Sequence, residues 1–183
     1  MANTSQQYDN IIKNTRDLFV KKMKDYGTSW RILRLSSLTD QIFIKAKRIR
    51  SIQQSGVNLV GDNTQGEFVA IVNYGIMALI QCELGDDTMD EIPPQRAEEL
   101  YDKYATQTKD LMLKKNHDYG EAWRDMRISS MTDIILQKIF RLKQIEDNRG
   151  KTIVSEGVQG SYTDIINYAV FCLIRMEEEN YKD

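Results

Sequence analysis

Residue types that could bind or hydrolyse a phosphorylated ligand occur twice in this chain, at matching offsets. The stretch "KMKDYGTSWRILRLSSLTD" spans residues 22–40, and "KNHDYGEAWRDMRISSMTD" spans residues 115–133. Carboxylates without accompanying histidine or thiolate ligands favour Mg²⁺ or Mn²⁺ over zinc. Lysine and arginine match phosphate oxygens, and a tryptophan can cover a base. Together these residues indicate metal-assisted attack of water on a phosphoanhydride.

The repetition is an internal duplication. Residues 15–53 align with 108–146 without a gap, with 19 identities in 39 pairs, and residues 65–83 align with 159–177 with 8 identities in 19 pairs. The only two prolines, Pro93 and Pro94, fall between the copies, where a linker and a helix start belong. We therefore predict a first repeat at 1–88 and a second at 89–183, together forming one unit.

Each repeat is expected to contain three helices. The first, at about 4–25 and 95–117, ends at a DYG whose glycine suits a left-handed cap. The second follows "SSLTD" or "SSMTD", where serine or threonine can cap the helix, and runs to about 54 or 147. The third and most apolar covers about 65–84 and 159–180. No stretch alternates convincingly as a strand, so the predicted fold is all-α, with six helices in two repeats about a pseudo-twofold axis.

Repeated polar residues lie beside the apolar stripe of the second helix and not opposite it. On a helical wheel, Asp40, Arg48 and Lys45 border this stripe. On the third helix of the second repeat, Asp164 and Asn167 share one side and are costly to bury unpaired. Polar groups at such an edge are half-buried or line a cleft.

Structural roles compete with each of these assignments. Asp40 and Arg48 could form an ion pair, and Trp30 and Trp123 are more often core anchors than platforms for a base. The repeated asparagines could satisfy a neighbouring helix end. The lysines at 21–22 and 114–115 fit solvated faces, and the single histidine fits a helix end. No paired Ser/His or Cys/His set is present for triad chemistry.

A family resemblance follows from the combined motif. The sequence resembles the nucleotide modification associated domain 1 family, once in each repeat, over nearly the whole chain. The motif that carries the resemblance reads Asp118-Tyr119-Gly120, Trp123, Asp133, Lys138, Arg141, Asp164 and Asn167-Tyr168. That family is itself similar to MazG-like all-α NTP pyrophosphatases, which have a K-x-x-R helix followed by a helix with acids and NY. The resemblance implies Mg²⁺ held by acids against a nucleoside triphosphate.

The acids depart from the pattern of that wider class. The third helix reads Glu67-x-x-Ala70 in the first repeat and Ser161-x-x-Asp164 in the second, so each repeat keeps half of an acidic pair. Either one composite site draws on both repeats, or the second repeat acts alone with help from Glu156, or the chemistry has been lost. We favour the second repeat, which offers four acids. The first repeat offers four as well, but Ala70 at the most buried position weakens it.

The candidate site follows from this choice. The predicted catalytic residues are Asp133, Asp164 and Glu156. The predicted substrate-binding residues are Lys138, Arg141, Trp123, Arg127, Asn167 and Tyr168. The predicted ligands of Mg²⁺ or Mn²⁺ are Asp118, Asp133, Glu156 and Asp164. The weaker site of the first repeat comprises Asp25, Asp40, Lys45, Arg48, Glu67 and Asn73.

Composition limits the partners. The net charge of −2 and the acidic pI make nucleic acid an unlikely partner. We identify no signal peptide and no apolar run near the roughly 20 residues that span a bilayer, so we expect a cytoplasmic protein without membrane contact. A homodimer is plausible because the third helices are so apolar. The predicted function is Mg²⁺-dependent nucleoside triphosphate pyrophosphohydrolysis. The alternatives are a non-catalytic nucleotide-binding protein and a structural helical protein.

Overall fold

The protein is a bundle of helices in the order predicted. The computed structural model describes residues 3–86, 88–151 and 157–179, and these residues form helices without strands, which confirms the all-α prediction. The α-helices are α1 (Thr4–Tyr26), α2 (Leu35–Ser55), α3 (Thr64–Leu84), α4 (Pro94–Tyr119), α5 (Ile128–Asp147) and α6 (Val158–Glu178). Two short 3-10 turns, η1 (Ser29–Ile32) and η2 (Ala122–Asp125), join the first helix of each repeat to the second.

The helix ends agree with the glycine signals but not with the predicted serine caps. Gly120 ends α4 in the left-handed region, and Gly27 ends α1 at φ 61° and ψ −148°, a region that residues with a Cβ rarely adopt. The residues before α2 and α5 are Arg34 and Arg127, which make no side-chain capping bond. The predicted serine caps are wrong because the "SS" pairs lie inside the first helical turn.

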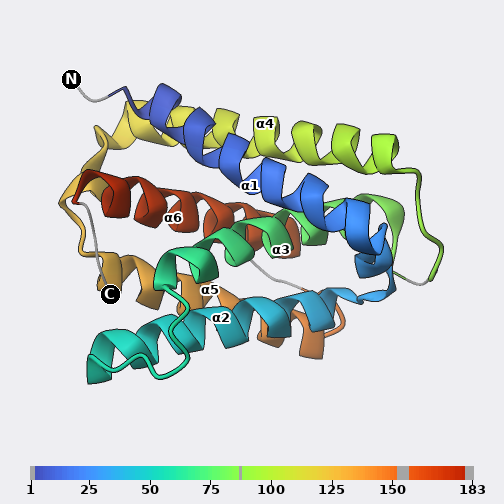
Figure 1. Cartoon of the computed structure of the whole chain (residues 1–183), viewed down its shortest axis with the longest axis horizontal. Helices are drawn as coiled ribbons and strands as arrows, with labels where there is room; N and C mark the ends of the chain where they lie inside the picture. Colours follow the sequence, from blue (N-terminus) through green and yellow to red (C-terminus); the bar gives the residue numbers. More distant parts are fainter. Residues whose placement is uncertain (1–2, 87, 152–156, 180–183) are drawn as a thin grey trace.

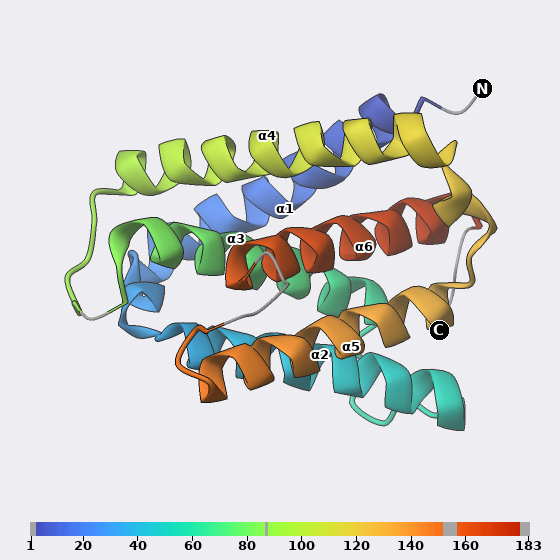
Figure 2. The same cartoon turned by 180° about the vertical axis from the view of Figure 1, so that it is seen from behind.

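The six helices form three layers of two (Figures 1 and 2). The middle layer contains α3 and α6, the most apolar helices, whose mutual contact is the largest in the described part of the chain. One outer layer pairs α1 with α4, and the other pairs α2 with α5. Every layer contains one helix from each repeat, as a pseudo-twofold relation requires. The division at 88/89 stays a prediction, because a single core runs through both repeats.

Helix α3 approaches α6 closely at one glycine. A Cβ added to Gly75 would lie 2.5 Å from Cγ1 of Ile166, so only glycine allows the observed helix separation. By length and composition α3 could also cross a membrane, a weak criterion that core helices of soluble proteins meet too. Most of its apolar window is buried here, so the burial of α3 explains its composition.

Two asparagine amides tie the middle layer to α1 and α4. Asn167 of α6 donates from Nδ2 to the carbonyl of Thr108 (3.2 Å) and accepts from the hydroxyl of Tyr8 (2.8 Å). The network recurs by pseudo-symmetry in the first repeat. There Asn73 donates to the carbonyl of Thr15 (3.0 Å) and accepts from Tyr101 (2.7 Å). Each amide thus joins both repeats. The asparagines have a structural role, but the carbonyls that they bind lie in the interior of α1 and α4 and not at a helix end.

The layer of α2 and α5 is also held by pairs that occur twice. Asp40 lies 3.2 Å from the ammonium of Lys143, and Asp133 lies 3.4 Å from the guanidinium of Arg50. Two further pairs use the buried hydroxyls of Thr39 and Thr132: Thr39 donates to Glu146 (2.7 Å), and Gln53 donates to the hydroxyl of Thr132 (3.1 Å). The two repeated aspartates therefore pair across the repeats, and the ion pair considered between Asp40 and Arg48 does not form.

Replacing Tyr8 by phenylalanine should destabilise the bundle. The change leaves the buried Oδ1 of Asn167 without its donor, which we expect to lower the free energy of unfolding by about 1–2 kcal/mol. Chemical denaturation measures this, with Tyr119→Phe as control because the exposed Tyr119 hydroxyl makes no hydrogen bond to the described residues. Equal stability of Tyr8→Phe and the wild type would show that the asparagine network contributes nothing.

Candidate functional site

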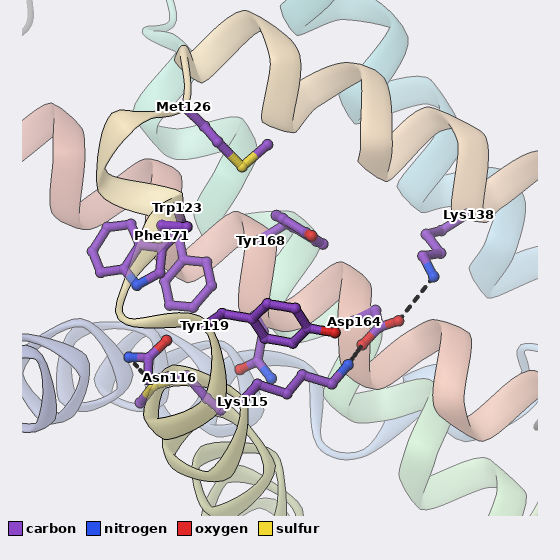
Figure 3. Close-up of a pocket in the computed structure, with 12 residues that line it drawn as sticks. Lys115, Asn116, Tyr119, Trp123, Met126, Lys138, Asp164, Tyr168 and Phe171 are labelled. Carbon is purple, nitrogen blue, oxygen red and sulfur yellow. Dashed lines mark hydrogen bonds and ion pairs between the residues drawn. The ribbon is translucent and has the colours of Figure 1, made fainter.

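A cavity in the second repeat gathers part of the predicted site. It has a volume of about 340 Å³ and lies between the C-terminal end of α4, the η2 turn, α5 and α6 (Figure 3). Its polar lining residues are Lys115, Asn116, Lys138, Asp164 and Asn167. Its apolar and aromatic lining residues are Met112, Tyr119, Ala122, Trp123, Met126, Tyr168 and Phe171. The cavity therefore has a charged part and an aromatic part.

Asp164 forms the centre of the charged part. Lys115 Nζ donates to Asp164 Oδ1 at 2.7 Å, and Lys138 Nζ lies 2.9 Å from Oδ2 (Figure 3). Desolvation by burial raises the pKa of Asp164, but hydrogen bonds and charges of the two lysines outweigh it, so its pKa lies below the usual value. Near neutral pH the cluster therefore has two positive charges and one negative charge.

The aromatic part differs from the predicted base platform. Trp123 is 5% exposed and stacks on Phe171, with ring centroids 4.2 Å apart and planes 4° from parallel. The Arg124 guanidinium lies 4.4 Å over the same ring. The buried Trp123 ring is thus covered by a stacked ring and a guanidinium and has the anchoring role considered above. The partly buried Tyr168 and the exposed Tyr119 present their rings to the cavity instead (Figure 3).

Several predicted residues lie outside this cavity. Asp118 is 75% exposed beside His117, and Asp133 is 57% exposed beside Arg50. Arg127 and Arg141 are exposed and do not line the cavity. Glu156 lies outside the described residues. The expected convergence of Asp118 and Asp133 with Asp164 is therefore absent from the described part of the chain, because the first two sit on outward helix faces.

The described residues do not fit a divalent cation site. They contain no group of three or more histidine, cysteine, aspartate or glutamate side chains that could hold a metal. Asp164, the one carboxylate among the described residues that line the cavity, already faces two ammonium groups. Mg²⁺ bound by protein carboxylates needs their oxygens free for coordination. No step of the chemistry is therefore assigned to a metal at this cavity.

In the first repeat, the lysine and the arginine of the K-x-x-R motif on α2 both pair with the same carboxylate. Arg48 donates to Glu67 Oε1 at 2.8 Å, and Lys45 lies 3.4 Å from Oε2 of the same carboxylate. In the second repeat serine stands at the position of Glu67, so the counterpart of Arg48, which is Arg141, loses this partner. Of the other candidates in the weaker copy, Asp25 is exposed and lines no cavity described for this chain, and Asp40 and Asn73 have the structural contacts given above.

Comparison with known proteins decides the family. The model of a protein family described as "nucleotide modification associated domain 1" matches residues 22–82 and again residues 115–176. Together the two matches cover more than half of the chain. The chain belongs to this family. No curated protein and no solved structure matches it significantly. The twofold match also agrees with the tandem repeat.

In this nucleotide modification associated domain, seven residues that line the cavity are not among the predicted site residues: Met112, Lys115, Asn116, Tyr119, Ala122, Met126 and Phe171. The sequence predicts a solvated face for Lys115, although its side chain reaches Asp164, and Tyr119 belongs to the DYG motif without being a predicted site residue. A signal for two of them was present: Lys115 and Tyr119 repeat Lys22 and Tyr26 of the first copy. One helical turn separates this lysine and tyrosine, so they share a helix face.

Replacing Asp164 by asparagine should weaken the fold of this family member near neutral pH. The amide cannot balance two lysines, so we expect a loss of about 1–2 kcal/mol in the free energy of unfolding. Because the folded pKa is lowered, the stabilisation is fully present above the unfolded pKa of about 3.9 and is lost as pH falls through the lowered value.

Urea unfolding of the wild type and the variant between pH 7 and pH 3 measures this difference. Asp110→Asn is the control, because Asp110 is an exposed aspartate on α4 that makes no ion pair with the described residues. A stability difference that does not shrink in acid would contradict the assignment of the ion cluster.

Proposed function

We propose that the cavity of the second repeat binds a nucleotide, with the phosphates at Lys115 and Lys138 and the base toward Tyr119 and Tyr168. The observation that carries the proposal is the pair of lysines on one carboxylate, placed beside an aromatic wall. Membership of a nucleotide modification associated family supports the ligand class. The volume of about 340 Å³ falls in the range of about 300–1,000 Å³ typical of small-molecule sites.

Asp164 has a definable role in this proposal. Lysine side chains are long and flexible, and ordering them on a ligand costs conformational entropy. By holding Lys115 from α4 and Lys138 from α5 on one carboxylate, Asp164 fixes both ammonium groups before a ligand arrives. Partial burial strengthens the attraction of these ammonium groups for phosphate. The ammonium of Lys138 also has donors beyond the one directed at Asp164.

A more specific version of the proposal is that the protein also hydrolyses the nucleotide that it binds. The resemblance to MazG-like pyrophosphatases implies cleavage of a phosphoanhydride with Mg²⁺ or Mn²⁺. The described residues supply one cavity carboxylate, and the further candidate Glu156 lies outside them. The geometry therefore supports nucleotide binding best, and turnover is measured as a separate outcome.

Isothermal titration with nucleoside mono-, di- and triphosphates tests the binding. We expect Lys138→Met and Lys115→Met each to weaken binding about tenfold, because each removes a charged donor to phosphate. Lys114→Met is the matched control, since this exposed neighbour does not line the cavity.

A pyrophosphate-release assay on the same samples, with and without Mg²⁺, separates binding from hydrolysis. Binding that Lys114→Met weakens as much as Lys115→Met, or the absence of binding by every nucleotide in the panel, would overturn the proposal.

A further inference from the structure

The first repeat contains a cavity at the equivalent place, and its chemistry is different. This cavity has a volume of about 540 Å³, against about 340 Å³ in the second repeat. Five lining residues are identical at the pseudo-equivalent positions: Lys22, Tyr26, Trp30, Asn73 and Tyr74 correspond to Lys115, Tyr119, Trp123, Asn167 and Tyr168. The same pocket has thus been built twice and has then diverged.

The first difference is the position of the acid. Ala70 stands where the second repeat has Asp164, and the acid of the first repeat lies one turn earlier, at Glu67. Glu67 draws Lys45 away from the cavity, whereas the equivalent Lys138 lines the cavity of the second repeat. Lys22 consequently forms no ion pair within the described residues, and no other Lys, Arg, Asp or Glu lines this cavity. Among the described residues, the cavity thus has one positive charge, at Lys22, that lacks an ion-pair partner.

The second difference is the freedom of the tryptophan ring. Met77 replaces the phenylalanine that stacks on Trp123. Arg31, the counterpart of Arg124, is buried away from the ring, where it donates to the carbonyl of Gly85 (2.9 Å) and to the side chain of Gln81. The aromatic neighbour of Trp30 is Phe19, tilted at a centroid distance of 6.1 Å. Trp30 is therefore partly exposed, without the stacked ring and the guanidinium that cover Trp123.

We propose that this cavity is a second ligand site, which takes a planar aromatic ring against Trp30 and a single anionic group at Lys22. A nucleoside monophosphate has this chemistry, and the volume of the cavity is sufficient for it. One lysine suits one phosphate, whereas the two lysines of the second repeat suit a longer phosphate chain. The site differs in place and in charge from the one under "Proposed function", and only the nucleotide ligand class is shared with that proposal.

In this proposal the aromatic ring of the ligand stacks on Trp30, and the Asn73 amide is not available to form hydrogen bonds with the edge of the base. Asn73 lines the cavity, but its amide oxygen and nitrogen are engaged by Tyr101 and by the carbonyl of Thr15. Stacking on an aromatic side chain tolerates every base. The site is therefore expected to discriminate by the number of phosphates more than by the base.

Fluorine NMR of the full chain labelled with 5-fluorotryptophan tests this inference directly. The sequence contains two tryptophans, one in each cavity, so two resonances report the two sites separately without any substitution. Trp30→Phe and Trp123→Phe serve only to assign them. Titration with AMP, GMP, CMP and UMP is expected to shift the Trp30 resonance at concentrations that leave the Trp123 resonance in place.

Three variants sharpen the result. Lys22→Met should weaken the response of Trp30 about tenfold, and Ala70→Asp should weaken it at least as much, because the new carboxylate would pair with Lys22 as Asp164 pairs with Lys115. Lys21→Met is the matched control, an exposed neighbour that does not line the cavity. The control should retain the wild-type titration.

The outcomes distinguish the two proposals. A Trp30 resonance that no monophosphate shifts, or a shift that Lys22→Met and Ala70→Asp leave unchanged, overturns the second site even if triphosphates bind at Lys115 and Lys138. A Trp30 response that depends on Lys22 supports the second site even if the cavity of the second repeat binds nothing.

Discussion

The arrangement of this protein depends on the mutual burial of α3 and α6. Both helices are apolar over most of their surface, and a three-helix repeat alone would leave one side of each in water. Burying that side against the other repeat removes apolar surface worth roughly 25 cal/mol per Å². The close approach at Gly75 lets the two helices pack at short range. Two amides, Asn73 and Asn167, then fix the outer helices to this centre.

Both cavities follow from this arrangement. The pseudo-twofold axis places them at opposite ends of the middle layer, each bounded by helices of its own repeat. As far as the described residues go, neither cavity takes a lining residue from the other repeat. A substitution such as Ala70 in place of Asp164 therefore changes one cavity without disturbing the other. After the duplication, the two cavities of one fold could therefore carry different charges. The acid of the third helix lies one helical turn earlier in the first repeat, at Glu67, than in the second, at Asp164.

The fold could be predicted from sequence because its signals are local and repeated. Apolar periodicity, the glycines after each DYG and the offset of 93 residues suffice for six helices in two repeats. The 3-10 turns were not predicted, since four-residue elements have no periodic signature. The site was predicted less well. Asp164, Lys138 and Tyr168 do line one cavity, but Asp118 and Asp133 do not, because a helical wheel cannot tell which helix will cover a polar edge.

The reason for the misassigned acids lies in the symmetry itself. A contact across a pseudo-twofold axis is made twice, so both of its partners tend to stay alike in the two copies. The charge pairs of Asp40 with Lys143 and of Asp133 with Arg50 are one such contact. Identity between repeats therefore reports the shared interface at least as strongly as it reports a ligand site. The cavity positions 70/164 and 77/171, which take no part in these charge pairs, differ between the repeats. In a duplicated protein of this kind, the differences at Ala70 and Met77, more than the identities, show where the two halves have separate tasks.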